Sequence, residues 1–266
     1  ATITAPDADH TVINQSSASA IINWQSFSIG ANQYVQFIQP DSSSVVLNRV
    51  VGSSPTSILG SLTANGQVFL VNPNGVLFGK GASLDVQGLV ASTLDISDSD
   101  CMAGHYVFSK GSGANDAGVV NQGQITAHNH GYVVLAGDYA ENDGIISARM
   151  GHVVLAAGSA STLTLDGSQY LSYEVNSATL SNYAGVTNTG ELLANGGGVL
   201  MTADVANALK ATVVNNSGLI EAQRISNQSG QITLTATGGD IVNSGVLDAQ
   251  GKLGYRGGDI VLKGDQ

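Results

Sequence analysis

Asn121-Gln122-Gly123-Gln124-Ile125-Thr126-Ala127, followed closely by Gly131-Tyr132-Val133-Val134-Leu135, is the stretch that decides the fold of this chain. The first part reads Asn-x-Gly-x-(Ile/Leu)-x-Ala and the second reads Gly-x-(Val/Ile)-x-(Leu/Met). In both, apolar residues recur at every second position, which is the period of a β-strand with one buried face. Glycine permits the tight corners between such strands. The stretch therefore predicts two short strands joined by a corner.

The same two patterns recur along the second half of the chain. Successive first glycines stand at 123, 144, 190, 218 and 245, so the steps are 21, 46, 28 and 27 residues. Two strands per unit at this period predict a solenoid, because one unit cannot bury its apolar face alone. We expect an all-β, right-handed parallel β-helix, with the recurring asparagines stacked as a ladder. A β-sandwich of short strands is the competing fold.

The first half of the chain and one later segment depart from the repeat. A solenoid needs a covered end, since an exposed terminal coil is an open strand edge. The 46-residue step indicates an insertion, which reads as a hairpin with an Asp166-Gly167 turn. We predict a single domain over residues 1–266, truncated from a longer protein, with an N-terminal β cap at 1–50, first coils at 51–158, an extra-helical insertion at 159–184 and regular coils at 185–266.

Composition excludes several classes of function. Hydrophobic residues make up 42% of the chain and charged residues only 11%, with a net charge of −11. The 9 basic residues are scattered, whereas nucleic acid and anionic membranes require clustered Lys and Arg. No apolar run approaches the roughly 20 residues that span a bilayer. The single cysteine, Cys101, is expected to be a buried thiol.

Candidate metal ligands are few. His128 and His130 would share one face if both lay on a strand, but no third ligand accompanies them. Asp95, Asp98 and Asp100 form an acidic cluster without the spacing of a calcium-binding loop. We expect no metal site and no cofactor, and interpret both groups as solvated side chains.

Two other classes of function are kept as alternatives. Parallel β-helices can carry polysaccharide lyase or hydrolase activity, which needs paired carboxylates or a basic residue beside them. No acidic pairs recur in adjacent units, so we expect no enzyme. A carbohydrate- or receptor-binding module is the second alternative. Tyrosines could line its surface, although packing of the hairpin on the helix is the preferred interpretation of these residues: Tyr132, Tyr139, Tyr170, Tyr173 and Tyr183.

A more specific motif lies upstream, within residues 61–76. Its core is Asn72-Pro73-Asn74-Gly75, followed by Val76. Upstream stands a segment that contains Asn23, Trp24, Phe27 and Gly30, and downstream stand Gly79-Lys80-Gly81-Ala82 and Gly88-Leu89-Val90-Ala91-Ser92-Thr93. Together these stretches resemble the haemagglutination-activity, or two-partner-secretion, domain of filamentous-haemagglutinin-like exoproteins. The motifs cover roughly residues 1–135, and the repeat style covers the rest.

The resemblance implies a function and partners. Such domains are right-handed β-helices with an N-terminal cap, at the front of very long secreted proteins, often adhesins. The resemblance implies that a dedicated outer-membrane β-barrel transporter recognises the chain in the periplasm through its POTRA domains, and that the β-helix forms outside the cell. We therefore expect a monomeric secretion-targeting domain of a secreted or cell-surface adhesin. Any host receptor or exopolysaccharide would be a partner of the full-length protein.

The tetrad Asn72-Pro73-Asn74-Gly75 has two interpretations, which are compatible. Pro at the second position followed by Asn-Gly is β-turn chemistry, so the tetrad can simply close a corner. It can also be the signal that the transporter reads. An additional Asn-Pro-Asn-Leu motif, found in part of the family, is absent here, where the sequence reads Gln39-Pro40-Asp41. The chain thus fits the adhesin branch that lacks it.

Overall fold

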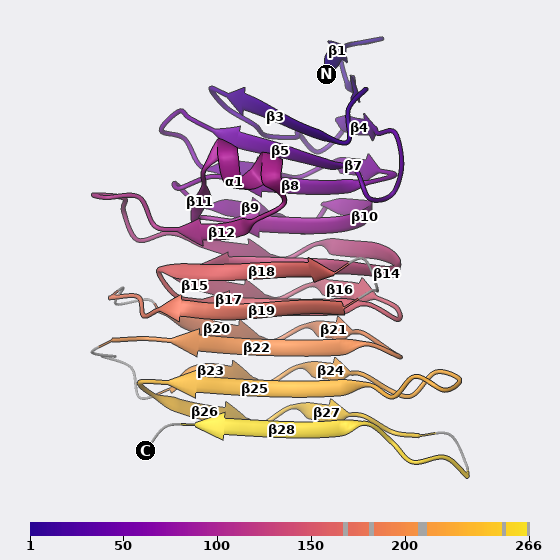
Figure 1. Ribbon diagram of the computed structural model, residues 1–266, viewed down its shortest axis with the longest axis vertical. Coiled ribbons are helices and arrows are strands. Elements are labelled where there is room, and N and C mark those ends of the chain that lie inside the picture. Colours follow the sequence, from indigo (N-terminus) through magenta and orange to yellow (C-terminus); the bar gives the residue numbers. More distant parts are fainter. Residues whose placement is uncertain (167–169, 181–183, 207–211, 252–253, 265–266) are drawn as a thin grey trace.

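The computed structural model describes residues 1–166, 170–180, 184–206, 212–251 and 254–264. The chain winds as a stack of coils, with the N-terminus at one end and the last strand at the other (Figure 1). The right-handed parallel β-helix predicted from the repeats is confirmed. The Asp166-Gly167 turn of the insertion lies partly outside the described residues.

The strands of the coils form three long faces, of which the third begins only with β6. The strands of the first face are β2 (His10–Asn14), β4 (Tyr34–Ile38), β7 (Ser61–Ala64), the first half of β10 (Ser83–Ser92), the first half of β14 (Gln124–Gly137), β16 (Ile145–Ala148), β21 (Glu191–Leu193), β24 (Leu219–Glu221) and β27 (Val246–Asp248). Those of the second face are β3 (Ser19–Trp24), β5 (Val45–Val50), β8 (Gln67–Val71), the second halves of β10 and β14, β17 (His152–Ala157), β22 (Gly198–Asp204), β25 (Gln231–Thr237) and β28 (Asp259–Gly264). Those of the third face are β6 (Thr56–Ile58), β9 (Val76–Phe78), β13 (Gly118–Asn121), β15 (Tyr139–Asn142), β20 (Gly185–Asn188), β23 (Thr212–Asn216) and β26 (Asp240–Asn243).

The number of strands per unit differs from the prediction of two. The Asn-x-Gly part of the first pattern is the corner between the third and first faces, because β15 ends at Asn142 and β16 begins at Ile145. The third strand was missed because it is short and carries few inward apolar residues, such as Val119 and Ala140. A period of two cannot be recognised over so few positions.

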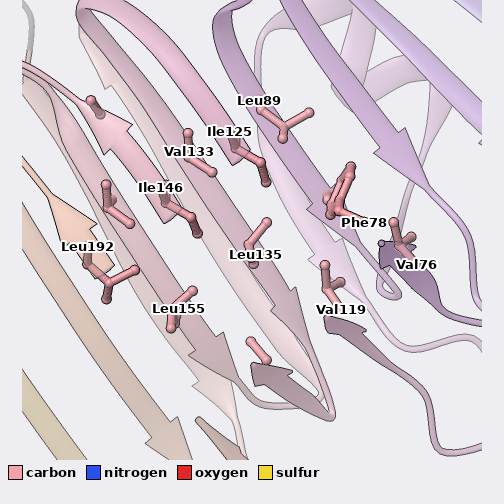
Figure 2. Close-up of a cluster of buried hydrophobic side chains, with 14 of the residues drawn as sticks. Val76, Phe78, Leu89, Val119, Ile125, Val133, Leu135, Ile146, Leu155 and Leu192 are labelled. Atoms are coloured by element: carbon pink, nitrogen blue, oxygen red, sulfur yellow. The ribbon is translucent and has the colours of Figure 1, made fainter. Parts of the chain in front are cut away.

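The interior is filled by the alternating apolar residues of all three faces. Val133 and Leu135 of β14 lie directly above Val153 and Leu155 of β17, in parallel register. All four are fully buried. Figure 2 shows Leu135 and Leu155 within this cluster, beside Ile146 from the first face. Because each layer repeats the one before it, burial of like residues on like residues fixes the register of the stack.

A column of stacked asparagines runs along the corner between the third and first faces. The side-chain amide of each asparagine except the last donates from Nδ2 to Oδ1 of the next, at 2.7–2.8 Å. The predicted ladder is therefore confirmed, and all but its last member are fully buried. The ladder consists of Asn121, Asn142, Asn188, Asn216 and Asn243.

A second, smaller sheet lies outside the β-helix. It is antiparallel and contains β11 (Asp95–Ile96), β12 (Tyr106–Ser109), β18 (Ala160–Asp166) and β19 (Tyr170–Ser177). The helix α1 (Asp98–Ala103) precedes β12. Strands β18 and β19 form the predicted extra-helical hairpin and lie in front of the coils in Figure 1, running alongside their strands. In the described ranges no helix has the length and apolarity to cross a membrane.

The outer sheet creates a second core. Phe69 and Val134, which point outward from the second face, pack with Phe108 and Tyr173 of the outer sheet. Phe69 and Tyr106 meet edge to face, with their ring centroids 4.9 Å apart. The β-helix thus has an apolar interior and, on one face, an apolar exterior that the outer sheet covers.

The N-terminal end differs from the later coils. Strand β1 (Thr2–Thr4) pairs antiparallel with β2, which covers the edge of the first coil. Strand β2 itself already stacks in parallel on β4. Parallel stacking thus begins within residues 1–50, the segment predicted as the cap. The division into cap, first coils, insertion and regular coils stays a prediction.

Candidate functional site

The motif Asn72-Pro73-Asn74-Gly75 forms the corner between β8 and β9. The backbone N–H of Gly75 donates to the carbonyl of Asn72 at 3.0 Å, which closes a β-turn. Gly75 has φ +109°, a region that residues with a Cβ rarely adopt. The tetrad is thus a β-turn in the folded chain.

Asn72 is the centre of the corner. Its side chain is 0% exposed, and its Nδ2 donates to the carbonyl of Ser54 and to Oγ1 of Thr56, both at 3.0 Å. Its Oδ1 accepts from the backbone N–H and from Nδ2 of Asn74, again at 3.0 Å. Asn74 also donates to the carbonyl of Gly52 at 3.0 Å. The tetrad is therefore bonded to the preceding coil, and its most buried member has no free hydrogen-bonding group.

The upstream motif lies on the first coils. Trp24 donates from Nε1 to Oδ1 of Asn48 at 3.0 Å, and its ring contacts that of Phe27 with centroids 5.2 Å apart. Gly30 begins a turn in which its N–H donates to Oε1 of Gln33 at 2.8 Å. The upstream motif and the tetrad lie at the same corner of the stack, with one coil between them: Gly52 of that coil accepts from Asn74 at 3.0 Å, and a Cβ on Gly52 would lie 2.0 Å from the carbonyl oxygen of Gln25.

Arg49 is a partly buried ion-pair residue beside the upstream motif that the sequence analysis did not single out. It lies on β5, and its side chain is only 13% exposed. Its guanidinium contacts Asp95 at 2.8 Å, Asp98 at 2.6 Å and the Ile96 carbonyl. It also donates to Oδ1 of Asn23 at 3.3 Å. The available signal was a single basic residue in a strand that is apolar apart from Asn48, which implies a buried partner.

The acidic cluster is therefore a docking point for α1. Two of its carboxylates, Asp95 and Asp98, pair with Arg49, and Asp100 accepts from the hydroxyl of Ser97 at 2.6 Å. Ser97 is the N-cap of α1, a position at which a side-chain oxygen satisfies a free backbone N–H. The three carboxylates are held by this chain's own donors, so the cluster fastens α1 to the first coils.

Cys101 reports whether α1 is docked. The thiol is buried, and this burial raises its pKa to about 11. At pH 8 roughly a thousandth of the thiol is then ionised, against roughly a quarter for an exposed cysteine. We expect a thiol reagent to label the native chain roughly 250-fold more slowly than the urea-unfolded chain, as measured by absorbance at pH 8.

The Arg49→Ala variant tests the docking itself. Loss of the guanidinium leaves Asp95 and Asp98 without their partner, so α1 should detach and labelling of Cys101 should approach the unfolded rate. The control is Arg149→Ala, which removes the same charge from an exposed side chain and should label as slowly as the wild type. Slow labelling of Arg49→Ala would mean that apolar contacts alone hold the helix.

The two histidines of the predicted pair do not lie together. His128 places Nε2 2.6 Å from Oδ1 of Asp85 in a cavity on the first face, also lined by Thr63. His130 lines a different cavity, beside Tyr132. The positive φ of His130, +63°, breaks the alternation that an unbent strand would have imposed.

The tyrosines serve packing where the structure describes them. Tyr132 donates to Oε1 of Gln67 at 2.6 Å, and Tyr173 donates to Oγ of Ser161 at 2.8 Å. Burial raises the pKa of both phenols. Tyr139 lies on β15, away from this cluster, with its ring packed over Gly118. The side chain of Tyr170 and the whole of Tyr183 lie outside the described residues.

Comparison with known proteins identifies the family. A family model described as the TPS secretion domain matches residues 1–249. A heme/hemopexin-binding protein of Haemophilus influenzae strain Rd is 36% identical over 233 residues, which is 84% of this chain and 25% of that protein. A second heme/hemopexin-binding protein of Haemophilus influenzae is 33% identical over 97% of this chain and 29% of its own length. The chain thus spans about a quarter of the length of these relatives.

A solved structure has the same fold. The crystal structure of the HMW1 secretion domain from Haemophilus influenzae matches with a TM-score of 0.85 at 32% identity. The match covers 99% of this chain and 67% of that one. The likeness therefore includes the extra-helical elements as well as the coils.

Proposed function

Because the chain belongs to the family of TPS secretion domains, we propose that it targets a larger exoprotein to its outer-membrane transporter, which reads it through POTRA domains before it folds. Proteins that carry such domains pass through the periplasm to the cell surface or the medium. The family is a secretion module and is not a known enzyme family. The partner, the moment of recognition and the residues read are our proposal.

The burial of Asn72 supports the proposal that the transporter recognises the chain before it folds. In the folded chain its side chain is 0% exposed, and both of its polar atoms are bonded within the corner. A partner that reads this residue must therefore meet the chain unfolded, when the tetrad is accessible. The same four residues then serve twice, first as a signal and later as a corner.

Folding outside the cell would complete the sequence of events. Residues 1–50 contain strands that pair with one another: β1 pairs with β2, and β2 pairs with β4. In a solenoid each coil contacts only its neighbours, so folding propagates unit by unit from a nucleus. We propose that the first coils are this nucleus and that folding beyond the pore hinders return of the chain.

An export assay tests the proposal. The domain, fused to a signal peptide, is expressed with and without its cognate transporter, and the medium and periplasm are compared for wild type, Asn74→Ala and Asn195→Ala. Asn195 is the matched control, because it also holds a corner, through the backbone N–H of Gln223 at 2.6 Å, but lies outside the tetrad. We expect transporter-dependent release of wild type and Asn195→Ala, and periplasmic retention of Asn74→Ala.

The folding of each variant must be measured beside its export. Purified Asn74→Ala that melts cooperatively while failing to leave the periplasm supports recognition of the tetrad. Equal retention of Asn74→Ala and Asn195→Ala would show that corners matter only through folding. Release of the wild type without any transporter would contradict the secretion role as a whole. The adhesin activity of the full-length protein stays a prediction.

A further inference from the structure

Two adjoining cavities lie between the β-helix and the outer sheet. The larger, of about 560 Å³, opens where the coils turn into the second face, and the smaller, of about 260 Å³, continues it toward the C-terminal coils. They share His152 and Leu171 in their walls. Together they form one groove, which we call the outer groove, running along the axis of the helix.

The outer groove follows a column of residues that begin the strands of the second face. The column runs through Gln67, Gly88, Tyr132, His152, Gly198 and Gln231, each paired with the next in parallel register. Five steps between neighbouring strands span about 24 Å. The groove therefore suits an extended ligand better than a compact one.

Two glycines in this column make room for the rings of neighbouring residues. A Cβ on Gly88 would lie 2.8 Å from the ring of Tyr132, and a Cβ on Gly198 would lie 2.9 Å from Nδ1 of His152. The ring of Tyr132 thus lies toward Gln67, and that of His152 lies toward Gly198. The two rings therefore point toward opposite ends of the groove.

His130 supplies a buried hydrogen-bonding atom without a partner beside the larger cavity. Its Nδ1 is buried and has no hydrogen-bond partner, an arrangement that costs free energy unless a ligand or water satisfies it. Its positive φ is shared by Met150 of the next coil, so the corner itself sets the direction of this residue. The next coil carries a methionine at the equivalent place, so the imidazole that this corner presents beside the cavity belongs to His130.

The rim of the larger cavity is rich in neutral polar groups. Side-chain amides and hydroxyls converge on it from four separate corners: Ser42, Ser43, Gln67, Gln87 and Asn129. Among the described lining residues of both cavities there is no Asp, Glu, Lys or Arg, although the chain as a whole carries a net charge of −11. A charged ligand would lose hydration there without gaining a counter-charge.

From these observations we propose that the outer groove binds a neutral oligosaccharide. Sugar hydroxyls donate and accept hydrogen bonds, which matches amides, serines and an imidazole. Part-exposed imidazole rings and the leucines of the hairpin offer apolar surface for sugar faces, as binding sites with a few placed polar groups commonly do. The groove exists only after the outer sheet has docked, so this is an activity of the folded domain and is independent of transporter recognition.

The test is a binding measurement on the intact chain. Immobilised neutral oligomers of glucose, mannose, galactose and N-acetylglucosamine, with oligogalacturonate and an extended peptide as the other arms, are screened first, and hits are titrated by calorimetry. We expect at least one neutral oligomer to bind, and expect Gln87→Ala and His130→Asn each to weaken it about tenfold. Asparagine at position 130 tolerates the positive φ.

The control separates the groove from the rest of the surface. Gln124 is, like Gln87, a glutamine on a strand of the β-helix, but it is exposed and lies on the first face outside both cavities. Gln124→Ala should bind as the wild type does. Absence of binding by every neutral oligomer, preference for oligogalacturonate or the peptide, or equal affinity of the wild type and both groove variants would each overturn the proposal.

Discussion

Replacement of Asn142 by alanine is expected to destabilise the β-helix by roughly 2–6 kcal/mol. Asn142 lies inside the ladder, where it accepts from Asn121 at 2.8 Å and donates to Asn188 at 2.8 Å, and it is 0% exposed. The substitution leaves the Nδ2 of Asn121 and the Oδ1 of Asn188 without these partners in the dry interior. Each orphaned buried polar group costs about 1–3 kcal/mol. Urea unfolding followed by circular dichroism measures the loss.

The end of the same ladder provides the control. Asn243 accepts from Asn216 at 2.7 Å but is exposed to solvent, so water replaces the lost group. We expect Asn243→Ala to cost less than about 1 kcal/mol. Equal losses for the two variants would show that the ladder contributes through its corner backbone, and that burial of its amides is unimportant.

Replacement of Gly190 by alanine is expected to cost about 3 kcal/mol or more, or to prevent folding. The backbone φ of Gly190 is ordinary, so conformational strain is not the reason. A Cβ at this position would lie 2.0 Å from the carbonyl oxygen of Gly144 in the coil above. Overpacking of a well-packed interior typically costs 1–3 kcal/mol, and here the obstacle is backbone that cannot rotate away. Thermal melting and the yield of folded protein measure the effect.

Gly111 is the matched control for that substitution. It is exposed, and a Cβ there would have no atom within 4 Å. Gly111→Ala should change the free energy of unfolding by less than about 0.5 kcal/mol, as surface substitutions usually do. If Gly190→Ala were as mild, the coils would have to be able to separate locally, and the close approach at this corner would not be a requirement of the fold.

The sequence predicted those features of the fold that repeat. Asn142 and Gly190 belong to patterns that recur unit after unit, and identical residues at identical positions must stack when the units stack. The extra-helical hairpin was predicted from the 46-residue step, because an insertion between Gly144 and Gly190 cannot be part of a regular coil. The third face was not predicted, since Val119 and Ala140 lie on strands too short to display a period.

The candidate site was predicted only in part. The tetrad was recognised, and its turn followed from Pro73 and Gly75. Its bonding to Gly52, Ser54 and Thr56 was not predictable, because these partners lie 16–22 residues away and their contacts depend on how one coil lies upon the next. Arg49 was missed for the same reason, with its carboxylate partners 46 and 49 residues further along the chain.

The sequence by itself determined the parallel β-helix, the asparagine ladder and the turn at the motif, because each depends on local alternation or on residues that repeat. Tertiary structure alone decided where His128 and His130 lie, how Arg49 holds α1, and that the outer groove exists. The Arg49 contacts and the outer groove arise where α1 and the outer sheet meet the second face, and the histidines are parted by the bend at His130. Their geometry depends on the packing of segments that share no repeat, so no period in the sequence records it.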